Sequence, residues 1–192
     1  PGLLGIILTM TMVMMTALAV TREYERGTME NLLAMPVRPI EVMAGKIAPY
    51  IIIGAVQVAV VLAAARLLFD VPFAGSIALF GIATLLFITV NLAIGFTFST
   101  IARNQLQAMQ MSFFFLMPSI LLSGFAFPFR GMPGWAQVIG EILPATHFLR
   151  IVRGLMLKAA ELNQVAGELA VLALMLILVS TVAVARYRVT LD

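Results

Sequence analysis

The sequence predicts an all-α protein, a polytopic membrane helix bundle with five transmembrane helices, a short amphipathic helix on the cytoplasmic side and an outer re-entrant helical hairpin. Two observations predict this fold class. Of the 192 residues, 62% are hydrophobic and 11% are charged, whereas soluble domains have about 45–50% apolar and about 25% charged residues. The apolar residues form long runs, and almost all the charges lie between those runs. Lipid is therefore the main solvent of this chain.

Five apolar stretches are long enough to cross a bilayer. A helix rises about 1.5 Å per residue, so a hydrocarbon core of about 30 Å takes about 20 apolar residues. Core helices of soluble proteins are the alternative, but five uncharged runs of this length in one small chain disfavour it. We expect residues 1–192 to form one transmembrane domain with spans at 3–20, 42–68, 77–101, 106–127 and 165–187.

Basic residues predict which side of the membrane each connection faces, because short cytoplasmic loops are rich in Lys and Arg. The connection before the second span, the turn after the third and the final tail are basic, with Arg22, Arg26, Arg38, Lys46, Arg103, Arg186 and Arg188. We place these on the cytoplasmic side, with the first residue outside and the last one in the cytoplasm. Segment 128–164 is then outside, although it carries Arg130, Arg150, Arg153 and Lys158.

The outer segment 128–164 is interrupted by helix-breaking residues. Pro128 and Pro133 end the fourth span, and Trp135 suits the interface between lipid and water. Pro144 divides two short helices, predicted at 135–143 and 145–162. This pattern favours a hairpin that either re-enters the outer leaflet or lies on the surface. In its second helix we expect His147, Arg150, Arg153 and Lys158 to face water, and Phe148, Leu149, Val152 and Leu155 to lie on the membrane.

The polar segment 21–41, between the first two spans, has a pattern of its own. Charged residues at three- and four-residue spacing predict pairs along one helix surface: Arg22 with Glu25, Glu23 with Arg26, and Arg26 with Glu30. Gly27 then breaks the helix, Thr28 is placed to cap a short helix over 28–35, and Pro39 begins the next span. The product is either an amphipathic helix that docks on a soluble partner or an ordinary solvated loop.

Polar and soft side chains within the spans have two interpretations each. Gln57 and Asn91 are expected to hydrogen-bond another helix or to face a wet cavity, because an unpaired polar group is costly in lipid. Methionine and phenylalanine gather in the first and fourth spans, where they either contact lipid or form a surface that accommodates varied ligands.

Several functional classes are excluded by what the chain lacks. It has no cysteine and a single histidine, His147, so we expect neither a thiolate metal site nor a multi-histidine site. The basic residues form no face interleaved with aromatic rings, so no nucleic-acid partner is expected. Gly45-Lys46 lacks the following Ser or Thr of a phosphate-binding loop. The chain is therefore expected to have no catalytic residue, no metal and no cofactor of its own.

Two separated motifs resemble the permeases of ABC type 2 exporters, including the drug-efflux-like members of bacterial inner membranes. One is TREYERGTMENLLAMPVRPIEVMAGK at 21–46, and the other is SGFAFPFRGMPGWAQVIGEILPATHFLRIVRGLMLK at 123–158. The resemblance implies that the first motif is a cytoplasmic coupling helix and the second a re-entrant region. It also implies an earlier span and an outer domain before Pro1, so that the sequence is a fragment of a longer permease.

The resemblance implies a role for specific residues. Contact with the ATPase subunit is expected at Arg22, Glu23, Glu25, Arg26, Gly27, Thr28 and Glu30; a substrate pathway at Met12, Met15, Met109, Phe113 and Met117; and the re-entrant outer segment at Pro128, Pro133, Trp135 and Pro144. ATP and Mg²⁺ would bind the ATP-binding cassette subunits, and a second permease copy or a homologue would complete a dimer in the bacterial plasma membrane. The exported substrate would be drug-like or lipophilic.

Two other functional classes compete with the exporter. An intramembrane enzyme predicts clustered ionisable residues at membrane depth, whereas the charges here lie at the ends of the spans. A passive channel needs no docking partner at its inner face. Co-purification of an ATPase subunit would separate the three.

Overall fold

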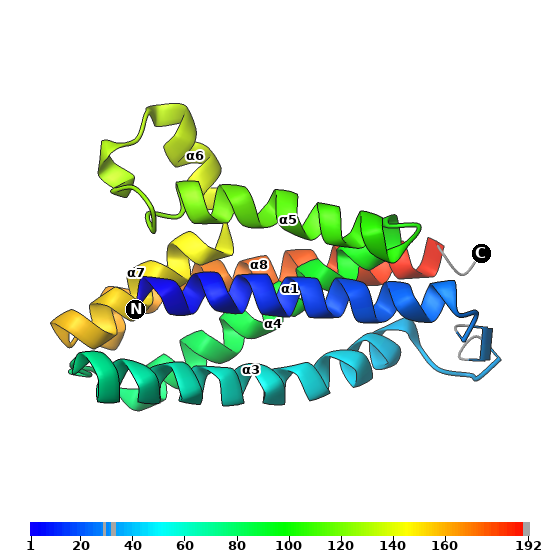
Figure 1. Ribbon diagram of the computed structural model, residues 1–192, viewed down its shortest axis with the longest axis horizontal. Helices are drawn as coiled ribbons and strands as arrows, with labels where there is room; N and C mark the ends of the chain where they lie inside the picture. The colour runs from blue at the N-terminus through cyan, green and yellow to red at the C-terminus, as the bar shows by residue number, and fades with distance from the viewer. Residues whose placement is uncertain (29, 32–33, 190–192) are drawn as a thin grey trace.

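The computed structural model describes residues 1–28, 30–31 and 34–189, and this part of the chain contains helices and no strand. Five long helices, α1 (Gly2–Glu25), α3 (Pro39–Phe69), α4 (Ile77–Ile101), α5 (Gln105–Leu122) and α8 (Leu162–Val189), lie lengthwise in one bundle (Figure 1). Each has a stretch long and apolar enough to cross a membrane. The predicted class, a polytopic bundle with five membrane-spanning helices, is confirmed.

The beginning of α1 and the end of α8 lie at opposite ends of the bundle (Figure 1). We call one end the Arg22 end; it holds the end of α1, the beginnings of α3 and α5, and the C-terminal part of α8. We call the other the His147 end; it holds the shorter helices α6 (Gly134–Ile142) and α7 (Pro144–Lys158) and the 3₁₀ turn η1 (Phe129–Gly131). The charged residues gather at these two ends, as the sequence predicts.

Helices α1 and α4 form the centre of the bundle. Gly95 of α4 allows this contact, because a Cβ atom there would lie 2.5 Å from the carbonyl oxygen of Val13 in α1. Gly54 brings α3 close in the same way, since its Cβ would lie 3.1 Å from the sulfur of Met12. Small residues let helix backbones approach within a membrane, where packing drives association.

The apolar face of α7 packs on protein, which corrects the expectation that it lies on the membrane. Phe148, Leu149, Val152 and Leu155 are all buried. The Phe148 ring stacks on Phe87 of α4 with centroids 4.1 Å apart. His147 is buried too, rather than facing water. An amphipathic pattern shows that a helix has an apolar face, but the helices available to cover that face are a matter of tertiary structure.

Two helices end earlier than expected. Helix α5 ends at Leu122, not near residue 127, because Gly124 adopts a left-handed conformation with φ +87. Helix α7 ends at Lys158, four residues before the expected end, because Ala159 is left-handed with φ +48. The chain therefore has a longer irregular connection between α5 and α6 than its hydrophobicity indicates.

Gln57 and Asn91 find different partners. Thr11 of α1 donates a hydrogen bond to the Gln57 side-chain oxygen at 2.9 Å, so this residue joins α1 to α3 as expected. The amide of Asn91 instead donates to the Phe87 carbonyl of its own helix at 2.8 Å. Only Gln57 therefore bonds across helices.

Candidate functional site

At the Arg22 end, an ion pair ties α1 to α3. Glu23 of α1 pairs with Lys46 of α3, whose side chain is 14% exposed against 40% for Glu23. Lys46 lies about two turns inside its helix, where a lysine without a partner would be costly to bury. The pair therefore holds together the two helices, α1 and α3, that segment 21–41 connects.

A second polar link joins α1 to α5. Gln105 begins α5, and its backbone N–H donates to the Glu25 carboxylate at 2.9 Å. The Gln105 side-chain amide donates to the other Glu25 oxygen at 2.5 Å, and the Arg22 guanidinium donates to the Gln105 side-chain oxygen at 3.3 Å. Sequence analysis missed Gln105, because a glutamine that starts a helix carries no signal of a partner 83 residues away.

These contacts correct the predicted pairing along one helix surface. Glu23 pairs with Lys46 rather than with Arg26, and Glu25 with Gln105. Arg26 is exposed at the end of α1, where its backbone N–H donates to the Arg22 carbonyl. The side chains of α1 turn to neighbouring helices because those helices present fixed partners at short distance.

The residues after α1 turn the chain away from the bundle. Gly27 is left-handed with φ +69, which supports the predicted break. The hydroxyl of Thr28 donates back to the Glu23 carbonyl at 3.2 Å, so it caps the end of α1 rather than the start of the next helix. Glu30 is helical and exposed, and its carbonyl accepts from the Ala34 N–H at 3.2 Å. The predicted helix over 28–35 also includes Met29, Leu32 and Leu33, which lie outside the described residues.

The beginning of α3 matches its sequence signals. Pro39 is the first residue of the helix, and the Glu41 carboxylate accepts a hydrogen bond from the Arg38 backbone N–H at 3.0 Å. Such a cap satisfies a donor that the first helical turn leaves free. The connection from α1 therefore enters α3 at a defined point.

The residues expected along a substrate pathway divide into two groups. Met15 of α1 and Met109 and Phe113 of α5 are 37%, 45% and 50% exposed, and Met117 is half-buried. Helices α1 and α5 pack side by side (Figure 1). The four residues can therefore contribute to one continuous surface, as the expected substrate pathway requires. Met12 is fully buried in the core, near Gly54, and does not contribute to it.

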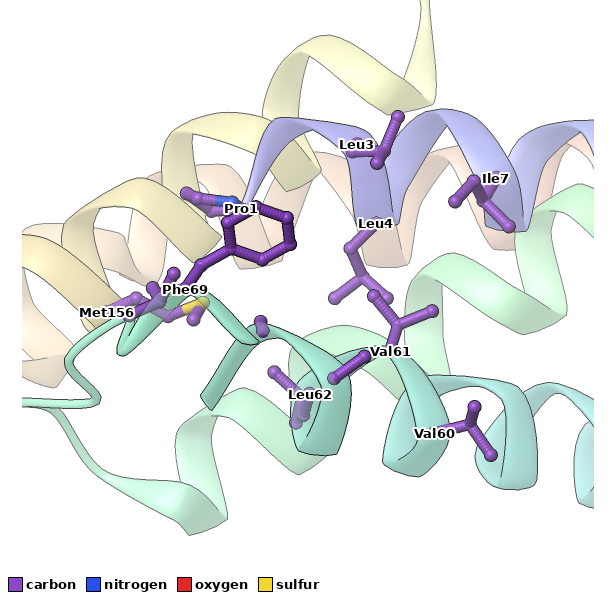
Figure 2. A pocket seen from close by; sticks show the side chains of 12 residues that line it. Pro1, Leu3, Leu4, Ile7, Val60, Val61, Leu62, Phe69 and Met156 are labelled. Atoms are coloured by element: carbon purple, nitrogen blue, oxygen red, sulfur yellow. The ribbon is translucent and has the colours of Figure 1, made fainter. Parts of the chain in front are cut away.

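An apolar pocket of about 360 Å³ lies elsewhere, between α1 and α3 near the His147 end. Figure 2 shows Leu4 of α1 and Val61 of α3 across it, with Phe69 and Met156 at one side. Its walls are hydrocarbon, which suits lipophilic molecules and offers no group to orient them. No residue of the expected substrate pathway lines it.

In the outer segment, prolines stand at the helix boundaries, as the sequence predicts. Pro128 precedes η1, Pro133 precedes α6, and Pro144 is the first residue of α7. Trp135 is 67% exposed on α6. The two short helices form a hairpin, and α6 projects from the side of the bundle near α5 (Figure 1).

A cluster of charged side chains links this hairpin to α8. The guanidinium of Arg150 donates to Glu141 of α6 at 2.5 and 3.1 Å and to Glu168 of α8 at 3.3 Å. It also lies 4.6 Å from the centre of the Phe129 ring, a favourable cation–π distance. The hydrogen bonds from Arg150 lower the pKa of Glu141, and in return the bonds to Glu141 raise the pKa of Arg150.

His147 belongs to the same cluster, whereas the sequence predicts that it faces water. Its Nδ1 contacts the Glu168 carboxylate, and its Nε2 lies 2.7 Å from the Glu141 backbone oxygen. A lone histidine carries little signal unless its partners are known. Within the ranges that the structure describes, no group of three or more His, Cys, Asp or Glu side chains is arranged to hold a metal ion.

Comparisons with known proteins agree with this architecture. The family model described as ABC-2 type transporter matches residues 1–157. In Escherichia coli K12, "Probable multidrug ABC transporter permease YbhR" is 36% identical over 88% of this chain and 46% of its own length. "Inner membrane transport permease YhhJ" of the same strain is 34% identical over 99% of this chain and 52% of its own length.

Similarity extends to a eukaryote. "ABC transporter G family member 20" of Dictyostelium discoideum is 29% identical over 85% of this chain and 22% of its own length. No solved structure matches the chain significantly. The chain spans about half the length of the bacterial relatives. Because the family model covers most of its residues, the chain belongs to the ABC-2 type transporter family.

Proposed function

We propose that residues 1–192 are the transmembrane domain of the permease subunit of an ATP-driven exporter in a bacterial plasma membrane. ATP and Mg²⁺ bind separate ATP-binding cassette subunits, and two permeases pair to enclose the pathway. The permease carries no catalytic residue. Segment 21–41 is the cytoplasmic coupling segment against which the ATPase pushes.

The observation that carries this proposal is the linkage of three helices at the Arg22 end. Glu23 binds Lys46 of α3, and Glu25 binds Gln105 of α5, while both acidic residues belong to the last turn of α1. Segment 21–41 connects α1 to α3 directly. A force on this segment therefore reaches α1, α3 and α5 together, which is what a coupling element requires.

Transport then follows from unequal affinity. A ligand shifts a conformational equilibrium only as far as its affinities for the two states differ. The ATPase pair closed on ATP binds segment 21–41 more tightly in the outward-open permease than in the inward-open one. The tie from α1 to α3 and α5 passes this difference on to the spans.

The substrate class is lipophilic or drug-like. One relative is named as a probable multidrug permease, and Met15, Met109 and Phe113 place soft apolar side chains on the surfaces of α1 and α5. Methionine and aromatic side chains adapt to ligands of varied shape. Because the same surface is suited to pairing with a second permease, the pathway lies where the two copies meet.

The full-length permease that contains this chain should co-purify with an ATPase subunit in mild detergent. We expect the candidate substrate to accelerate ATP hydrolysis by the complex several-fold over the substrate-free rate. The control is the same complex with the phosphate-binding lysine of the ATPase subunit substituted. It gives the background rate of ATP hydrolysis. A permease that moves substrate without ATP or any bound ATPase would be a passive channel, and the proposal would be abandoned.

Topology provides an independent check, because the proposal requires the Arg22 end to be cytoplasmic. Single cysteines at Asn31 and Asn104 should be shielded from an impermeant thiol reagent in intact cells, while one at Gly131 should react. All three positions are exposed on the protein, so shielding reports the membrane and not burial. Permeabilised cells, in which all three should react, provide the control. Labelling of Asn31→Cys from outside would reverse the orientation.

A further inference from the structure

Both ring nitrogens of His147 face hydrogen-bond acceptors. Nδ1 contacts a carboxylate oxygen of Glu168 on α8. Nε2 lies 2.7 Å from the backbone carbonyl oxygen of Glu141 on α6. The side chain is 4% exposed, so water has little room to take the place of either partner.

Counting protons shows what this geometry requires. A carbonyl oxygen only accepts, so Nε2 must carry a hydrogen. Nδ1 and a carboxylate oxygen repel each other unless a proton lies between them. The pair of His147 and Glu168 therefore holds two protons in all. This count is the same whether the shared proton sits on the ring or on the carboxyl group, so it does not depend on the tautomer.

The charges around the pair also favour this count. Arg150 of α7 bonds the carboxylates of both Glu141 and Glu168. With the shared proton in place, the two carboxylates balance the guanidinium and the imidazolium, and the cluster is neutral. Without it, the cluster carries one negative charge beside a buried ring, which is unfavourable.

Among the described residues, the charged groups outside the cluster are distant, exposed or bound to other partners. Helices α4 and α5 contain no charged residue, and those of α1 all lie in its last turn, at the Arg22 end. Arg153 of α7 donates to the Gly124 carbonyl at 3.0 Å, and Arg66 and Asp70 at the end of α3 pair with each other. The remaining charged side chains near this end, Arg130, Lys158 and Glu161, are exposed to solvent. The balance is therefore decided within the cluster.

We propose that His147 and Glu168 form a proton-binding site that clasps the α6–α7 hairpin to α8, and that release of the shared proton to water loosens the hairpin. His147 sits at the meeting point of the three helices, since it bonds α6 through Glu141 and α8 through Glu168. The site depends on neither the ATPase partner nor the direction of transport, and so it stands apart from the proposed function.

The sign of the pH dependence follows from proton counting. The clasped form holds the shared proton and the open form releases it, so acid favours the clasp and rising pH opens it. Linkage limits the change for a single proton to about tenfold in the opening equilibrium for each pH unit. Strong acid acts in the opposite direction, because protonation of Glu141 below its lowered pKa removes its charge-assisted bonds to Arg150.

A buried cysteine can report the opening. Ala145 of α7 is 1% exposed and packs in the core next to the clasp, so Ala145→Cys reacts with a thiol reagent only when the hairpin moves. Gly131→Cys, at an exposed position of the same outer segment, measures how the reactivity of an accessible thiol toward the reagent changes with pH. The chain has no cysteine of its own. The rates are measured between pH 5.5 and 9 on the full-length permease in lipid nanodiscs, with any other cysteines replaced.

The Glu168→Gln variant tests whether the shared proton, and not another titrating group, causes the pH dependence of hairpin opening. A glutamine amide donates to Nδ1 of a neutral histidine, so it reproduces the same hydrogen bonds with a hydrogen of its own and needs no proton shared with a carboxylate. Glu161→Gln is the matched control, because Glu161 is exposed just before α8 and its carboxylate is not part of the cluster. Glu168→Gln and Glu161→Gln are each combined with Ala145→Cys. Their labelling rates are compared in preparations of equal protein amount that elute at the same volume in size-exclusion chromatography.

We expect the rate ratio of Ala145→Cys to Gly131→Cys to rise with pH by up to about tenfold per unit. The rise should persist in Glu161→Gln and disappear in Glu168→Gln, which stays unreactive at every pH. A flat ratio in the parent protein, or an equal rise in Glu168→Gln, would overturn the proposal. So would a Glu168→Gln protein that reacts at every pH, because charge pairing with Arg150 would then hold the clasp instead of the shared proton.

Discussion

Arg26→Ala should leave the permease at wild-type abundance in the membrane and abolish substrate-stimulated ATP hydrolysis by its partner. Arg26 is exposed at the end of α1, directly before the left-handed Gly27. An exposed ion pair contributes only about 0.2–1 kcal/mol to folding, so removing this side chain barely affects the permease. Loss of one partner from a buried docking contact costs about 2–5 kcal/mol, which is enough to uncouple two subunits.

Glu23→Ala acts on the same segment but through a second effect. Its removal leaves Lys46 largely buried without a counter-charge, so we expect lower thermal stability as well as uncoupling. The spacing of charges in the sequence pairs Glu23 with Arg26 and gives no indication of Lys46 as its partner. The exchanged pair Glu23→Lys with Lys46→Glu should recover stability, and a double-mutant cycle would measure the coupling between the two residues.

ATPase assays on co-purified complexes, normalised to permease content by immunoblot, test these variants. Arg66→Ala is the matched control, since Arg66 is also exposed and pairs with Asp70 at 3.2 Å, but lies at the His147 end. It should keep full stimulation. Full transport by Arg26→Ala at normal abundance would reduce segment 21–41 to a simple connector and remove the main support for the coupling role.

Gly95→Val should prevent stable folding of the bundle. A Cβ at this position would lie 2.5 Å from the Val13 carbonyl oxygen and 3.0 Å from the Thr16 Cβ, both in α1. Overpacking usually costs about 1–3 kcal/mol, and more where the obstacle is backbone that cannot change rotamer. Because α1 and α4 form the centre of the bundle, separating them also weakens the packing of α7 against both.

Gly81→Val on the same helix is the matched control, because nothing lies within 4 Å of a Cβ at Gly81. The fraction of protein that stays monodisperse after heating in detergent measures both variants. Gly95→Val should aggregate at a temperature at which the parent protein and Gly81→Val survive. Equal survival of the two variants would mean that α1 and α4 separate without harm, against the packing described above.

Hydrophobic runs alone were enough to predict five spans, because the length of each span is set by the thickness of the bilayer and not by the neighbouring helices. Local signals also located Gly27 as a break and Pro39 as the first residue of α3, since backbone conformation near Gly and Pro depends on the residue itself. The family resemblance rested on the same local patterns, in segments 21–46 and 123–158.

Tertiary structure decided which partner each polar side chain finds. Glu23 meets Lys46 and Glu25 meets Gln105, whereas spacing along the helix pointed to neighbours in the same segment. The proposed role of His147 depends on its contact with Glu168, 21 residues later on another helix. The apolar face of α7 was visible in the sequence, but whether lipid or protein covers it depends on where α1, α4 and α8 lie. Contacts between residues far apart in the chain follow from how whole helices pack, and no local pattern specifies them.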